Sequence, residues 1–209
     1  MAKEGVLDFD SKKAKWHLGP ELFLLGNLAA KRYDITEIAR PIVREIADLT
    51  GESSFLSARR GNETVCILRE EGAFPIRSFV LYEGVRFPLG VASAGLAILS
   101  FMPESELHSY LKQQTQLETE WGKAHNFEEI HKRVIQTRER GFALNPGLIV
   151  EGSWGIGAAV FDPAGKPAWA LSVTGIESRF KPDRQKQIGE TLVQKAHTLS
   201  QLVQGHLRT

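Results

Sequence analysis

The apolar residues of this chain change their spacing several times, and the order of these changes constrains the fold more than any other feature. Residues 35–49 and 181–207 carry apolar side chains at helical spacing. Between these stretches, strand-like patterns recur at residues 53–58, 64–69, 74–81, 142–144, 153–161 and 167–175. Strands that alternate with helices and short turns predict an α+β domain with a mainly antiparallel sheet.

The first 18 residues have the pattern of a polar β-hairpin, with two extended segments around a turn at residues 10–13. Two strands alone are marginally stable in water, so this hairpin is expected to belong to a larger unit. Residues 19–33 are expected to form a helix. Asp34 and Glu37 have the spacing of a capping box at the start of the next helix.

Composition excludes several classes of protein. A net charge of +1 over 209 residues argues against a domain that binds nucleic acid by itself, because such domains carry a basic excess. The single cysteine, Cys66, allows no internal disulfide and is expected to be a buried apolar side chain. The longest apolar stretch, residues 93–102, is too short to cross a bilayer, so no membrane partner and a cytoplasmic location are expected. The six histidines are scattered, so no metal site or other cofactor is predicted.

Residues 90–95 form a run of small side chains that leads into a predicted helix. Ser93 is expected to be the N-cap of this helix. The exposed backbone N–H groups at the start of this helix and the helix dipole would attract an anion. The segment is therefore a candidate cradle for a carboxylate, and the alternative is a tightly packed helix start. Ser93 does not fit the nucleophile elbow of serine hydrolases, because Val91 stands where that motif has glycine.

Two later strands carry further candidate binding residues. Residues 152–157 are rich in glycine but lead into a strand, whereas a dinucleotide-binding loop leads into a helix, so that kind of loop is excluded. Glycines in a strand indicate a bulge or the close approach of a ligand. Trp154 within this run could close a pocket or cover the core. Ser172 and Thr174 alternate with apolar residues, so both hydroxyls share one face of their strand, either lining a cavity or half exposed.

The order of these segments resembles the IclR family of bacterial transcription regulators across most of the chain. The segments that carry the resemblance are His17-Leu18-Gly19-Pro20, Asp34-Ile35-Thr36-Glu37-Ile38-Ala39-Arg40-Pro41, Phe87-Pro88-Leu89, Ala92-Ser93-Ala94-Gly95-Leu96-Ala97, Arg140-Gly141-Phe142-Ala143, Ala158-Ala159-Val160-Phe161-Asp162 and Ala170-Leu171-Ser172-Val173-Thr174-Gly175.

The resemblance implies a GAF-like effector-binding domain, in which helices flank both faces of an antiparallel sheet. It divides the chain into the wing hairpin of a winged helix-turn-helix (1–18), a linker helix (19–33) and the effector-binding domain (34–209). It also implies a homodimer or homotetramer that contacts DNA through the winged helix-turn-helix of the full-length protein, not through this chain alone.

The resemblance places the effector pocket on the backbone amides of Ser93 and Ala94 and on Asn145, Gly155, Ser172 and Thr174, to which the residue patterns add Trp154. The family often has His at Gly90, Lys at Leu96, an acidic residue at Asn145 and in some members Cys at Gly155. This chain has no acidic side chain at Asn145 and has space at Gly155. Both differences imply that the effector is a small organic acid of more than two or three carbons, for example an aromatic one.

The leading interpretation is therefore a ligand-sensing domain and not an enzyme. A free-standing GAF-type sensor that signals to a partner other than DNA is the first alternative. A small serine hydrolase that uses Ser93 is the second.

Overall fold

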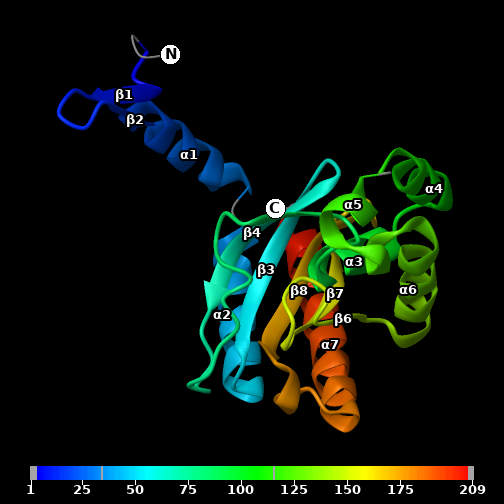
Figure 1. The fold of residues 1–209 in the computed structure, drawn as a ribbon. Coiled ribbons are helices and arrows are strands. Elements are labelled where there is room, and N and C mark those ends of the chain that lie inside the picture. The colour runs from blue at the N-terminus through cyan, green and yellow to red at the C-terminus, as the bar shows by residue number, and fades with distance from the viewer. Residues whose placement is uncertain (1–3, 34, 115, 207–209) are drawn as a thin grey trace. The chain divides into compact units, whose positions relative to one another are not determined.

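The computed structural model describes residues 4–33, 35–114 and 116–206 of the chain (Figure 1). The chain separates into two compact units, the first ending at Glu37 and the second beginning at Ile38. The described elements of the first unit are β1 (Leu7–Asp10), β2 (Lys15–Leu18) and α1 (Pro20–Tyr33), followed by the start of α2 (Ile35–Thr50).

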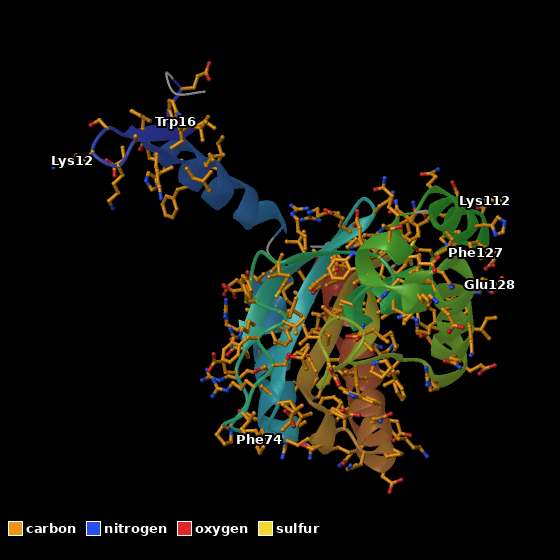
Figure 2. All side chains as sticks on the ribbon, viewed as in Figure 1. Lys12, Trp16, Phe74, Lys112, Phe127 and Glu128 are labelled. Atoms are coloured by element: carbon orange, nitrogen blue, oxygen red, sulfur yellow. The ribbon has the colours of Figure 1, made fainter. Side chains whose placement is uncertain are left out.

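The first unit is a short antiparallel hairpin followed by a helix. Phe9 and Trp16 are paired across the hairpin, with ring centroids 5.0 Å apart, and Figure 2 shows Trp16 and Lys12 on this hairpin. The carboxylate of Asp10 closes the turn by accepting hydrogen bonds from the backbone N–H groups of Lys12 and Lys13. Most of the large apolar side chains of α1 are exposed: Phe23 is 70% and Leu28 64% accessible in the single chain.

Within the described residues, the second unit is built on one six-stranded antiparallel sheet in the order β5-β4-β3-β8-β7-β6. Its strands are β3 (Ser53–Arg60), β4 (Glu63–Glu70), β5 (Arg86–Pro88), β6 (Ala143–Pro146), β7 (Ser153–Phe161) and β8 (Pro167–Ile176). Its helices after α2 are α3 (Ser93–Ser100), α4 (Glu104–Gln113), α5 (Leu117–Trp121), α6 (Phe127–Arg140) and α7 (Pro182–His206), with short 3-10 turns at Lys123–His125 and Glu177–Arg179.

Helices cover both faces of this sheet (Figure 1), as the sequence predicts. The long α7 and the part of α2 from Ile38 onward cover one face, and α3 lies against β7 and β8 on the other. Arg184 of α7 donates a hydrogen bond of 2.6 Å to the carbonyl oxygen of Thr50 at the end of α2. Because side chains alternate along a strand, neighbouring residues of β3, β7 and β8 enter two different environments.

The predicted mixed α+β architecture is confirmed, and most strand positions agree with the sequence pattern. The predicted strand over 153–161 coincides with β7, and the one over 167–175 coincides with β8 except for its last residue. The predicted helix over 19–33 corresponds to α1. The capping box that begins at Asp34 lies outside the described residues.

Two local predictions are wrong. Residues 74–81 are irregular, and the strand that pairs with the far edge of β4 is the shorter β5. Pro75 has no backbone N–H to give to a ladder, and the N–H of Phe74 bonds to the carbonyl oxygen of Gly51 instead. Ser93 is not an N-cap: Ala92 occupies that position, and Ser93 is the first residue of α3.

Candidate functional site

The helix α3 begins in the interior of the domain, and its first turn has no side-chain cap. All eight of its residues are buried, and Ala92 offers no side-chain oxygen to the first backbone N–H groups. These N–H groups have no carbonyl partner within the helix, and a buried helix start normally finds one elsewhere. The start of α3 is therefore a place where a hydrogen-bond acceptor, and an anion above all, would be stabilised.

Two glycines of β7 let the start of α3 lie directly on the sheet. A Cβ atom at Gly157 would stand 2.7 Å from the carbonyl oxygen of Ser93, and one at Gly155 would stand 2.9 Å from its Oγ. The close approach expected for the glycine-rich run is thus the approach of a helix. The space that the sequence assigned to a ligand at Gly155 is already filled by Ser93, so it does not argue for a larger acid.

Beside this contact lies a cavity of about 30 Å³, which is room for about two water molecules. All seven residues predicted for the pocket line it, namely Ser93, Ala94, Asn145, Trp154, Gly155, Ser172 and Thr174. They come from α3, β6, β7 and β8, which the sheet order brings together. The structure therefore gathers every predicted site residue around one cavity.

Two hydroxyl groups of the cavity have no hydrogen-bond partner among the described residues. Ser172 Oγ and Thr174 Oγ1 are both buried and both unpaired, and both side chains belong to the cavity-facing side of β8. A buried polar group without a partner costs free energy, so such groups in a folded protein need an explanation. A polar ligand that accepts or donates hydrogen bonds in the cavity would supply one.

Asn145 is held in place by bonds to two backbone segments. Its Nδ2 donates to the carbonyl oxygen of Val91 at 2.6 Å, and its Oδ1 accepts from the N–H of Leu148 at 3.1 Å. The first bond joins β6 to the loop that precedes α3. Asn145 thus positions the start of α3, and its amide is mostly occupied before any ligand arrives.

No charged side chain lines the cavity among the described residues. Any attraction for an anion there would come from the start of α3 and from hydroxyl groups. The lining includes no His, Asp, Glu or Lys, so Ser93 has no general base beside it and the arrangement cannot activate it as a nucleophile. The site can bind by hydrogen bonds and apolar contact.

A buried histidine lies outside the cavity, on the turn after α5. The Nδ1 of His125 lies 2.8 Å from the carbonyl oxygen of Trp121, and the side chain is 1% exposed. Burial lowers the pKa of His125, and the guanidinium of Arg133 lowers it further. The ring is therefore held in its neutral form.

Sequence patterns missed several residues that line the cavity, namely Ser57, Thr64, Val80, Leu81, Phe87, Ala92, Ile149 and Ser153. Ser57 and Thr64 could have been found, because they lie on predicted strands of the same sheet. Val80 and Leu81 could not, because residues 74–81 are irregular, and strand alternation does not predict two adjacent residues that both line the cavity. Ile149 lies in the irregular segment between β6 and β7 and shows no periodic signal.

The described part of the chain contains no group of three or more His, Cys, Asp or Glu side chains placed to hold a metal ion. None of the helices described is both long enough and apolar enough to cross a membrane.

Comparison with known proteins gives a consistent result. The family model for the C-terminal part of the bacterial transcriptional regulator IclR matches residues 27–201. The HTH-type transcriptional regulator KipR of Bacillus subtilis is 28% identical over 203 residues, which is 97% of this chain and 80% of KipR. The HTH-type transcriptional repressor AllR of Escherichia coli is 30% identical over 191 residues, covering 91% of this chain and 70% of AllR.

Solved structures agree with this result. The crystal structure of IclR from Thermotoga maritima superposes with a TM-score of 0.80 at 26% identity, over 97% of this chain and 81% of that one. The fold is also shared with an IclR-type regulator from Alicyclobacillus acidocaldarius, with a TM-score of 0.81 at 23% identity, over 96% of this chain and 80% of that one. The relatives are named as regulators and repressors of transcription, which confirms the prediction that the chain is not an enzyme.

Proposed function

Because the chain belongs to the IclR family of bacterial transcriptional regulators, we propose that its second unit senses a small organic acid and transmits this to DNA binding. The observation that carries the proposal is the pair of unpaired buried hydroxyls of Ser172 and Thr174 in the cavity beside the uncapped start of α3. A carboxylate there would accept hydrogen bonds from both kinds of donor, and the helix dipole would favour its negative charge.

The cavity limits what this acid can be. About 30 Å³ accommodates a very small acid after modest side-chain movement, whereas an aromatic acid needs the lining to open. The lining carries no cationic side chain, and the start of α3 can stabilise one carboxylate, so a monocarboxylate fits better than a dicarboxylate. Val80, Leu81 and Phe87 supply apolar contact for the rest of the ligand.

Isothermal titration with acetate, pyruvate, butyrate and benzoate, each compared with its uncharged amide, tests the proposal. At least one acid should bind, and more tightly than its amide, because the start of α3 favours negative charge. Ser172→Ala should weaken that binding about tenfold or more, the loss expected for one hydrogen bond to a charged group.

Ser109→Ala is the matched control, since Ser109 is an exposed serine on α4, a helix that contributes no residue to the cavity lining. It should leave the affinity unchanged. If no acid binds, or if the two substitutions act alike, the proposed effector site is wrong.

The first unit supports the other half of the proposal. We propose that residues 1–18 are the wing hairpin of a winged helix-turn-helix, 19–33 a linker helix and 34–209 the effector-binding domain. The exposed apolar side chains of α1, Phe23, Leu24, Leu25 and Leu28, favour burial against the same helix of a second copy. The full-length protein would then act on DNA in the cytoplasm, as a homodimer or homotetramer.

Sedimentation analysis of the chain with and without Leu25→Glu tests this assembly. The unmodified chain should sediment as a dimer or larger species, and the substitution should shift it toward monomer, because a charge cannot be buried in an apolar helix contact without cost. A monomer in both cases would rule out assembly through α1.

A further inference from the structure

Residues at the start of β7 and in the irregular segment 75–81 form a wall of the effector cavity, and this wall separates two hollows. On its inner side is the cavity of about 30 Å³ described above. On its outer side is an open groove of about 430 Å³, lined by Arg77, Phe79 and Val150 among others. Val80 and Ser153 line both hollows, and Ser78 lines the groove. The wall is thus about one layer of side chains thick.

One half of this wall, residues 75–81, has backbone hydrogen bonds to the rest of the domain only before and after it. Before it, the N–H of Phe74 bonds to the carbonyl oxygen of Gly51, and the guanidinium of Arg179 lies 3.8 Å from the centre of the Phe74 ring. Figure 2 shows Phe74 at the end of the domain where β3 begins. After it, the N–H of Gly84 bonds to the carbonyl oxygen of Cys66. No backbone-to-backbone hydrogen bond joins residues 75–81 to another described residue.

The other half of the wall is fixed to the sheet. The N–H of Ser153 bonds to the carbonyl oxygen of Val150, and Gly152 accepts a bond of 2.8 Å from the N–H of Glu177 at the end of β8. The two halves meet in a hydrogen bond of 2.6 Å between the hydroxyl groups of Ser78 and Ser153. Ser78 is 8% exposed, so this bond is largely shielded from water.

We propose that residues 75–81 form a gate of the effector cavity, that the Ser78–Ser153 hydrogen bond keeps this gate closed, and that Val80 blocks the passage from the outer groove. The proposal rests on the proposed function in one respect only, the purpose of the cavity. A cavity of about 30 Å³ has no room for most small acids, so a ligand can enter only where part of the lining moves aside. Residues 75–81 are suited to this movement, because no backbone-to-backbone hydrogen bond joins them to another described residue.

Cysteine labelling tests the gate without any ligand. Ser172→Cys places a thiol inside the cavity, where Ser172 is 1% exposed, and its reaction with iodoacetamide requires the wall to open. In this background, Ser78→Ala should raise the rate of labelling at position 172 about fivefold, the change expected when one hydrogen bond is lost. Ser153→Ala and the double substitution should give the same rise, because all three break a single bond.

The chain contains its own control for loosening of the fold. Cys66 is 2% exposed, does not line the cavity, and burial raises the pKa of its thiol to about 12. It reacts only when the sheet itself opens, and peptide mass spectrometry separates its labelling from that at position 172. Val80→Ala offers a second way to open the passage and should also speed labelling at position 172 alone.

Faster labelling at position 172 with an unchanged rate at Cys66 is the expected result. Three results would overturn the gate: no change at either position, an equal rise at both, or labelling of Ser172→Cys as fast as that of an exposed cysteine before any gate substitution. The outcome is independent of the carboxylate titrations, which use no gate variant. Either proposal can therefore fail while the other stands.

Discussion

The two faces of the sheet are built from the same strands but differ in polarity and in how completely they are packed. On the side of α2 and α7, the inward side chains of the central strands are Leu56, Ile156, Leu171 and Val173, none more than 1% exposed. On the side of α3, Phe55 and Ala170 belong to the apolar core, but Gly155, Ser172 and Thr174 border the cavity. One face is filled with apolar side chains, and the other is partly polar and incompletely filled.

The difference indicates which face of the sheet contributes most to stability and which is available for binding a ligand. A filled apolar face contributes to the free energy of unfolding through burial, and removal of even one methylene group from it lowers that free energy. A hollow face with unpaired hydroxyls is costly in the free protein and gains partners when a ligand enters. Adjacent residues of β8 should therefore respond to substitution in opposite ways.

The largest expected effect comes from the filled face. Leu171→Ala should lower the free energy of unfolding by about 2–5 kcal/mol, because it leaves a cavity under α7. Urea unfolding followed by circular dichroism measures this loss. Ser172→Ala, one residue along the same strand, should change it by less than about 1 kcal/mol. Equal losses for the two variants would mean that the faces do not differ as described.

A smaller effect, of opposite sign, is expected on the hollow face. Thr174→Val keeps the shape of the side chain but removes an unpaired buried hydroxyl, so the ligand-free protein should gain about 1 kcal/mol of unfolding free energy. The same variant should bind the carboxylate identified by titration less tightly. The reverse exchange on the filled face, Val173→Thr, should cost about 1–3 kcal/mol because its hydroxyl finds no partner. Urea unfolding of both variants decides the comparison, and a loss of stability in Thr174→Val would contradict it.

The smallest effect expected is a dependence on pH at the side of α3. His125 has its pKa lowered in the folded protein by burial and by Arg133, so below the ordinary value of 6.5 the unfolded chain binds more protons than the folded one. Stability should therefore fall as the pH is lowered through and below 6.5. Unfolding measured between pH 7.5 and 5 should show this fall, and His125→Gln should reduce it. An identical pH profile in both proteins would show that another group is responsible.

The sequence predicted the fold well where apolar periodicity and tertiary contacts agree. The pattern over 153–161 coincides with β7, because this strand is paired on both edges and buried on both faces. The same reasoning failed for residues 74–81, whose apolar residues resemble a strand. Apolar content reports the preference of a segment and not whether a neighbouring strand is available to bond with it. Here Phe79 is 74% exposed, and Leu81 points into the cavity lining instead.

By itself, the sequence determined the class of fold, the family and seven of the residues that converge on one cavity. Small side chains at the start of α3 and alternating hydroxyls on β8 are local features, which can be recognised in the sequence without knowledge of the fold. Only the tertiary structure decided that Ser93 fills the space beside Gly155, that the cavity is small, and that Ser78 meets Ser153 across 75 positions of sequence. These facts depend on the distance between segments remote in sequence, which packing sets and no single segment encodes.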